Sequence, residues 1–257
     1  MQRVVILNSK GGSGKTTIST NLASLSATRG KTTVLMDYDP QHSSMHWSER
    51  RGGRDPRIHV IDACVQKSKM TRSWQIRLPD ATDQVIMDAP AGVSGLLLQE
   101  LMPRADVVLI PVAPSTIDIQ ATADFIRDLL LASKIRSRIS SNELYIGIIA
   151  NRIRSTRPVY EPLKRFLARL DIPFVAALSD TDNYITAAEQ GIGIYEMNPA
   201  DVAIERAEWR PLIEWLDRPS HHAPELQRTE PQPPAADEPS NLQPLRPPKG
   251  SVTNLIR

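Results

Sequence analysis

Eight residues near the start of the chain have the types and the spacing that polyphosphate binding requires. An apolar stretch over residues 4–7 leads into the run Lys10-Gly11-Gly12-Ser13-Gly14-Lys15-Thr16-Thr17. Glycines let backbone N–H groups converge on an anion, and a helix that begins with Lys-Thr-Thr points its positive end at the same anion. Lys15 would reach the β- and γ-phosphates, Thr16 would bind Mg²⁺ and Thr17 would donate a further hydrogen bond. The run is therefore predicted to be a P-loop that binds a nucleotide, and not an empty glycine turn.

Three aspartates follow apolar runs and could complete this site. Asp88 comes directly after Val85-Ile86-Met87, and the apolar run over residues 32–36 ends in Asp37 and Asp39. Asp88 fits a Walker B strand, whose carboxylate holds Mg²⁺ mostly through water because the ion keeps part of its hydration shell. Two carboxylates at alternating positions beside a P-loop indicate function more than a solvated strand end or a helix cap.

The elements that must position these residues follow an α/β order. Further apolar runs over residues 106–112, 144–152 and 174–178 lack polar alternation, as in strands covered on both faces, and a long helix is expected to end near residue 134. This pattern predicts a doubly wound, mostly parallel sheet flanked by helices, in which ligands bind at the carboxyl ends of the strands. We expect one domain over residues 1–217. Residues 218–257 are proline-rich and polar, and are predicted to form a disordered tail.

The lysine at position 10 makes the predicted P-loop distinctive. The run KGGxGKTT resembles the deviant Walker A motif of the ParA/MinD family of P-loop ATPases, and the segments DxDPQ (37–41) and DAPAG (88–92) are similar to motifs of the same family. The resemblance implies that ATP joins two subunits in a homodimer and that Lys10 contacts the nucleotide of the partner subunit. The alternative for Lys10 is a solvated cation beside the loop.

The same resemblance implies roles for three further residues and for one segment. Asp39 would position the attacking water, Asp37 would lie in the metal shell, and residues 88–92 would act as a switch segment. Asn151 is similar to the position where relatives contact adenine, although a satisfied asparagine at a strand end is an equal alternative. The implied cofactors are ATP and Mg²⁺.

The implied function is closest to that of ParA-type ATPases, which position or segregate a cargo such as a plasmid, a chromosome or a protein assembly. A cargo-bound adaptor protein would stimulate slow ATP hydrolysis, and the dimer would bind nucleoid DNA nonspecifically in the cytoplasm. The net charge of +2 is too small to indicate DNA binding by itself. We expect the contact from a basic cluster that begins at the end of the apolar run over residues 144–152: Arg152, Arg154, Arg157, Lys164, Arg165 and Arg169. The acidic residues in the loop 179–183 argue against DNA contact through that loop.

Other functions stay open. The alternatives are a MinD-like ATPase that cycles on a membrane, an ATP-dependent ligase on the same fold, and a scaffold that binds partners through its proline-rich tail. The sequence has no apolar run of membrane-spanning length, no signal peptide is expected, and residues 250–257 are too short and too weakly basic for an amphipathic membrane helix. Cys64 is the only cysteine, which fits a reducing cytoplasm. His42 and His46 are four residues apart, but the sequence places no third metal ligand beside them.

Overall fold

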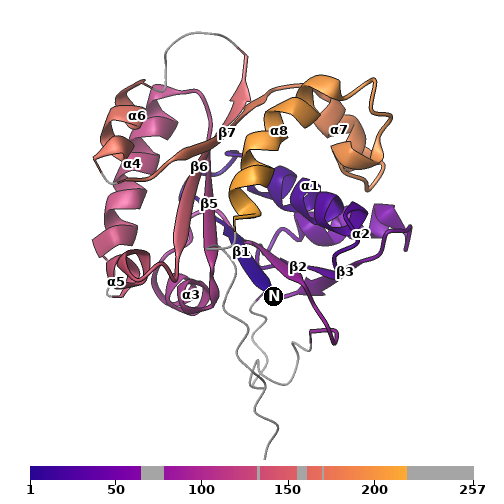
Figure 1. Ribbon diagram of the computed structural model, residues 1–257, viewed down its shortest axis with the longest axis horizontal. Coiled ribbons are helices and arrows are strands. Elements are labelled where there is room, and N and C mark those ends of the chain that lie inside the picture. Colours follow the sequence, from indigo (N-terminus) through magenta and orange to yellow (C-terminus); the bar gives the residue numbers. More distant parts are fainter. Residues whose placement is uncertain (65–77, 132–133, 155–160, 170, 219–257) are drawn as a thin grey trace, which may run out of the picture. The chain divides into compact units, whose positions relative to one another are not determined.

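The computed structural model describes residues 1–64, 78–131, 134–154, 161–169 and 171–218 (Figure 1). Within these residues a parallel sheet runs in the order β3-β2-β4-β1-β5-β6-β7. Its strands are β1 (Gln2–Ile6), β2 (Thr33–Asp37), β3 (Ile58–Asp62), β4 (Gln84–Asp88), β5 (Val107–Val112), β6 (Tyr145–Ile153) and β7 (Phe174–Ser179). The predicted doubly wound sheet is confirmed.

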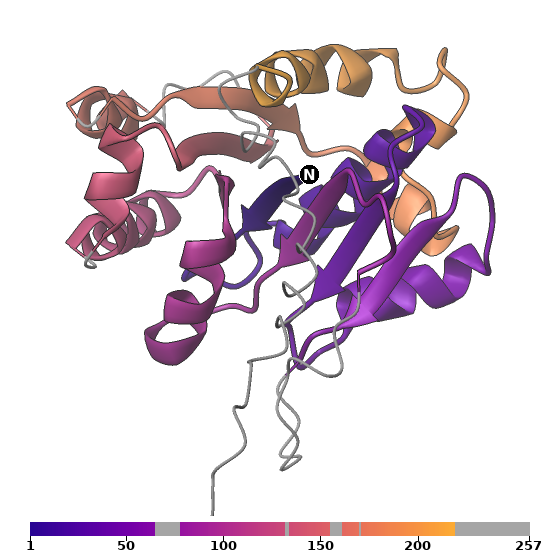
Figure 2. The same ribbon diagram turned by 60° about the horizontal axis from the view of Figure 1, so that its bottom comes forward.

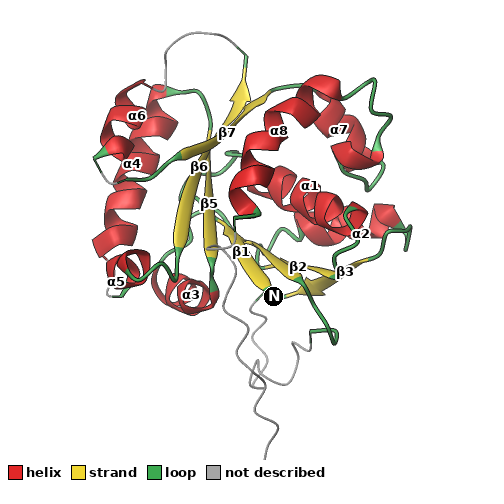
Figure 3. Ribbon diagram, viewed as in Figure 1, coloured by secondary structure: helices red, strands yellow, loops and turns green. Residues whose placement is uncertain are grey.

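Helices cover both faces of the sheet, as the red and yellow elements of Figure 3 show. One face carries α1 (Lys15–Thr28), α2 (Ser43–Arg51), α7 (Asp182–Glu189), the short 3-10 helix η3 (Ile194–Glu196) and α8 (Ala203–Leu216). The other face carries α3 (Gly95–Leu101) with the 3-10 turn η2 (Met102–Arg104), α4 (Thr116–Leu131), α5 (Ile135–Ser140) and α6 (Glu161–Ala168). Figure 2 shows the two groups of helices from another side.

The two helical layers explain why the central strands are apolar throughout. In β1, Val4 and Ile6 pack with α1 and α8, whereas Val5 packs with α3 and α4 on the other face. All three are fully buried. A strand whose successive side chains enter two different cores has no face for polar residues, so its sequence does not alternate.

The strand register brings the ends of β1, β2 and β4 together. Asp88 pairs with Ile6 of β1 and with Asp37 of β2, so both carboxylates lie where the chain leaves β1 for the P-loop. These strand ends form the edge at which ligands bind in such sheets.

The predicted elements differ from the observed ones in three details. The edge strand β3 was not predicted, the long helix that was expected to end near residue 134 ends at Leu131, and a separate helix, α5, follows it. The proposed tail lies outside the described residues except for Arg218, so its disorder stays a prediction. In the part of the chain that the structure describes, no helix is both long enough and apolar enough to cross a membrane.

Candidate functional site

The loop between β1 and α1 has the backbone shape of a P-loop. Gly14 immediately precedes α1 with φ of 92°, in the left-handed region that favours glycine. A Cβ at this position would overlap with Nδ2 of Asn151. Asn151 is buried at the end of β6, and its Nδ2 donates a hydrogen bond of 2.8 Å to the Ser13 carbonyl. The glycine therefore allows both the turn and the close approach of the side chain that supports it.

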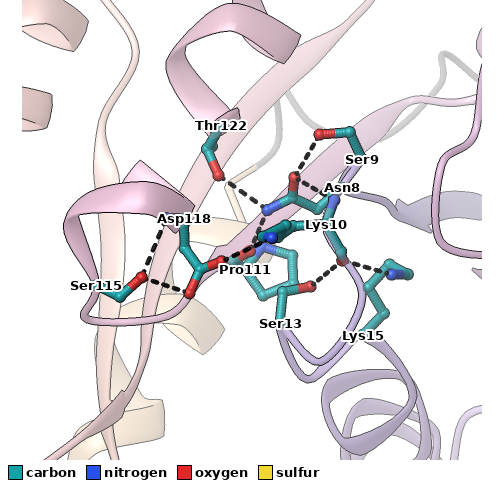
Figure 4. A network of polar contacts seen from close by, with 9 residues as sticks. All are labelled: Asn8, Ser9, Lys10, Ser13, Lys15, Pro111, Ser115, Asp118 and Thr122. Carbon is teal, nitrogen blue, oxygen red and sulfur yellow. Dashed lines mark hydrogen bonds and ion pairs between the residues drawn. The ribbon is translucent and has the colours of Figure 1, made fainter. Parts of the chain in front are cut away.

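Asn8 joins the start of this loop to the neighbouring strand and helix (Figure 4). Its buried Nδ2 donates to the Pro111 carbonyl at 2.7 Å and to the Thr122 hydroxyl at 3.0 Å. Its Oδ1 accepts the backbone N–H of Lys10 at 3.3 Å. Both the beginning and the end of the loop are thus fixed by buried amide side chains.

The two lysines of the loop point to different places. Nζ of Lys15 donates to the Lys10 carbonyl at 3.2 Å, and the Lys15 side chain is buried inside the site. Burial lowers the pKa of the Lys15 ammonium, against the charges of Asp88 and Asp39, which raise it. Lys10 turns toward α4 instead, where its Nζ lies 3.9 Å from Oδ1 of Asp118 (Figure 4). Its side chain is 42 % exposed, so this ammonium can leave the ion pair without breaking a core contact.

Asp88 lies fully buried among hydroxyl groups. Its Oδ1 accepts a hydrogen bond from Ser19 at 3.1 Å, and its Oδ2 accepts one from Ser44 at 2.8 Å. Burial raises the pKa of the Asp88 carboxyl to about 6, although hydrogen bonds from Ser44, Thr16 and Ser19 lower it. Thr16 is the hydroxyl that a P-loop offers to Mg²⁺, so two of the predicted metal residues lie near each other.

Asp37 and Asp39 lie on the loop that leads from β2 into α2. Oδ1 of Asp37 accepts the backbone N–H of Asp39, and its Oδ2 accepts that of Met45, each at 3.0 Å. The carboxylate therefore caps α2, while burial raises its pKa. Asp39 is partly exposed and accepts the backbone N–H of Gln41 at 3.0 Å. The structure gives Asp37 a structural contact, and its place in a metal shell stays a prediction.

These residues surround a cavity that suits a nucleotide. The cavity has a volume of about 810 Å³ and is lined by P-loop residues, by Asp39 and by Arg152. A second cavity of about 470 Å³ shares Gly14, Thr17 and Arg152 with the first and also contains Asn151. Hard oxygen donors (Thr16, Asp88), a buried ammonium and glycine backbone together fit a polyphosphate with Mg²⁺.

Comparison with known proteins agrees with this geometry. The sequence matches the CobQ/CobB/MinD/ParA nucleotide binding domain family over residues 4–194. The chain belongs to this family. It is 25 % identical to the maintenance of carboxysome distribution protein A of Halothiobacillus neapolitanus over 195 residues, which are 76 % of this chain and 87 % of that protein.

Two solved structures share the fold of this ParA/MinD-family chain. A plasmid partition protein from Borrelia burgdorferi bound to AMPPNP has a TM-score of 0.62 at 16 % identity, covering 83 % of this chain and 99 % of that one. The septum site-determining protein MinD from Pyrococcus horikoshii, complexed with Mg-ADP, has a TM-score of 0.56 at 16 % identity, covering 84 % and 96 %. The family resemblance that the motifs predict is therefore confirmed.

The predicted DNA-binding cluster of this family member is partly paired with acids. Nε of Arg152 lies 3.4 Å from Oδ1 of Asp180, and Nε of Arg154 lies 2.5 Å from its Oδ2. Although burial opposes it, the hydrogen bond from Arg154 and the charge of Arg152 lower the pKa of Asp180. Lys164 pairs with Glu161 at 3.1 Å. The remaining predicted residues are Arg165 and Arg169, which are exposed on and just after α6, and Arg157, which lies outside the described residues.

The sequence did not reveal three residues that hold the site of this ParA/MinD-family chain together. Ser19 stands one helical turn after Lys15, so its spacing could have suggested the contact with Asp88. Asn8 is a polar residue at the end of an apolar run, which is a weaker signal. Ser44 gives no signal, because its contact with Asp88 joins two segments that only the fold brings together. His42 and His46 lie beside different carboxylates, Asp62 and Glu49.

Proposed function

We propose that this protein is a ParA-type ATPase that positions or segregates an intracellular cargo. ATP with Mg²⁺ joins two copies in a dimer, the dimer binds double-stranded DNA of the nucleoid without sequence preference, and a cargo-bound adaptor stimulates hydrolysis. The cargo is a DNA molecule or a protein assembly in the cytoplasm. Relatives named for carboxysome distribution and for chromosome partitioning support this function over that of a ligase.

The position of Lys10 is the observation that carries the proposal. A P-loop needs one lysine at the phosphates, and Lys15, whose Nζ lies inside the loop against the Lys10 carbonyl, would take that role. Lys10 faces away from its own site, and among the residues that the structure describes its ammonium pairs with Asp118 alone, in a partly exposed ion pair. A second lysine in this position is available to the phosphates of another subunit, where it would stabilise transition-state charge as an arginine finger does.

Each residue of the site has a role in this proposal. The P-loop N–H groups and Lys15 hold the phosphates, and Asn151 keeps the loop in shape from the side of the proposed adenine site. Thr16 and Asp88 would hold Mg²⁺, with Asp37 near them, and the ion would neutralise phosphate charge. Asp39 lines the cavity and orients the attacking water. In this mechanism, loss of the γ-phosphate releases the loop contacts and the dimer separates.

The test compares three lysine variants by ATP binding and by molar mass in solution. Lys15→Ala is expected to lose ATP binding. Lys10→Ala is expected to bind ATP and remain a monomer, whereas the wild type forms a dimer with ATP. Lys31→Ala is the control, because Lys31 pairs with Asp217 at 3.8 Å on a segment outside the site. An ATP-dependent dimer of Lys10→Ala would refute the role of Lys10, and ATP binding by Lys15→Ala would refute the site.

A further inference from the structure

A small basic cavity lies at the end of α2, away from the P-loop. It has a volume of about 260 Å³. The residues that line it are Ser48, Arg51, Gly53, Arg54, Arg57, Ile58 and His59. Among the described residues, three arginines and a histidine contribute to its wall, and no carboxylate does. Asp55 is the one acid in the loop 52–57, and it is not among the lining residues.

Arg51 forms the inner wall of this cavity and is built into the core. It is 5 % exposed, and its Nη2 lies 2.8 Å from Oε1 of Glu196 and 2.6 Å from the Pro56 carbonyl. Glu196 neutralises its charge. Its Nε, however, has no hydrogen-bond partner within the described residues, which is uncommon for a buried donor. The cavity thus has a rigid inner wall, and the buried Nε is not counted among the groups that a ligand can reach.

Arg54 and Arg57 supply the excess charge. Both are exposed, and neither forms an ion pair with any residue that the structure describes. Arg152 and Arg154 differ, because both are held by Asp180. Binding an anion at Arg54 and Arg57 therefore breaks no existing ion pair, whereas binding one at Arg152 or Arg154 competes with a carboxylate.

We propose that Arg54 and Arg57 bind phosphate groups of duplex DNA at this cavity. Guanidinium groups match phosphate oxygens in geometry, and the cavity is small enough to favour a compact anion. The choice of duplex DNA as the ligand rests on the proposed function. The site lies at one end of α2, whose other end follows the Asp39 loop, about 13 Å away along nine residues of helix.

The experiment measures anisotropy of a fluorescent random-sequence duplex with ATP over a range of salt concentrations. It compares the wild type with Arg54→Gln/Arg57→Gln, with Arg152→Gln/Arg154→Gln and with Arg165→Gln/Arg169→Gln. The first variant is expected to bind DNA more than about tenfold more weakly, because two charge-assisted contacts are lost. The magnitude of its slope of log affinity against log salt should decrease by about 1.8, because each of the two lost phosphate contacts contributes about 0.9. ATP binding and molar mass are measured in parallel.

The outcomes separate this inference from the proposed function. If Arg54→Gln/Arg57→Gln binds DNA with the affinity and the salt dependence of the wild type, the inference is overturned. An acidic protein segment would then be the ligand class for the cavity. An ATP-dependent dimer of the wild type that binds no DNA would also overturn it, while the ATPase part of the proposed function stands. DNA binding that depends on Arg54 and Arg57 in a protein that neither binds ATP nor dimerises would support the inference and refute the proposed function.

Discussion

The buried carboxylate of Asp88 leads to an unusual expectation, namely that removing its charge stabilises the protein without nucleotide. Burial raises the pKa of the Asp88 carboxyl from 3.8 to about 6, against hydrogen bonds from Ser44, Thr16 and Ser19. At about 1.36 kcal/mol for each pKa unit, the difference corresponds to about 3 kcal/mol of stability lost when the group is ionised. Asparagine keeps nearly the same shape and has no charge to bury.

The pH dependence follows from proton binding in the two states. Between about pH 4 and pH 6 the folded protein holds a proton on Asp88 that the unfolded chain has released, so stability falls as pH rises through this window. The amide of Asp88→Asn can accept from one serine and donate to the other, since a hydroxyl also accepts. We expect the variant to be more stable by about 2 kcal/mol at neutral pH, which raises the melting temperature by about 4–8 °C, and to lose this advantage near pH 4.

Thermal and urea unfolding of both proteins, without nucleotide or Mg²⁺, would test this at about pH 4 and at neutral pH. Asp180→Asn is the control of opposite sign, because Arg154 and Arg152 lower the pKa of Asp180 and removal of that charge should not stabilise the protein. A neutral-pH stability of Asp88→Asn equal to or below that of the wild type would show that the hydroxyl groups fully compensate the buried charge.

Two further variants probe the contacts around the P-loop. Gly14→Ala is expected to abolish nucleotide binding and to lower the free energy of unfolding, because the added Cβ overlaps with Asn151. The double variant Gly14→Ala/Asn151→Ala should recover part of that free energy, with about 1–2 kcal/mol still lost to the left-handed backbone. No recovery in the double variant would contradict the overlap. Ser44→Ala is expected to raise the Mg²⁺ concentration needed for ADP binding about tenfold. Ser26→Ala is the control, because it removes a buried hydroxyl that donates to Gln84 away from Asp88, and it should leave the required Mg²⁺ concentration unchanged. An equal effect in both variants would contradict a specific role for Ser44.

The sequence predicted the central strands well because burial on both faces requires apolar residues at every position. β3 escaped prediction for the opposite reason. It is the edge strand, its residues are only half-buried or exposed, and His59 interrupts the apolar pattern of Ile58, Val60 and Ile61. The break between α4 and α5 was also missed. Lys134 there has φ of 80°, a left-handed conformation for which a lysine gives no sequence signal.

The site could be predicted as far as its motifs are local. The P-loop run encodes its own turn and helix, and Asp88 ends its strand as expected. The supporting contacts could not be predicted, since Asn151 reaches Ser13 from a strand far along the chain and Ser44 reaches Asp88 from another helix. The acidic loop that argued against DNA contact contains the carboxylate, Asp180, that pairs with two of the predicted arginines.

Lys15 and Asp88 together indicate how ligand binding and folding stability are linked in this protein. Burial favours the neutral form of both groups, lowering the pKa of one and raising that of the other. Phosphates would compensate the ammonium, and Mg²⁺ the carboxylate. A ligand at about 100 times its Kd stabilises the folded state by about 2.7 kcal/mol, which is close to the amount that the Asp88 charge removes. Mg²⁺ together with nucleotide should therefore raise the melting temperature of the wild type more than nucleotide alone. In Asp88→Asn this extra increment should be smaller, because the ion still neutralises phosphate charge but no buried carboxylate.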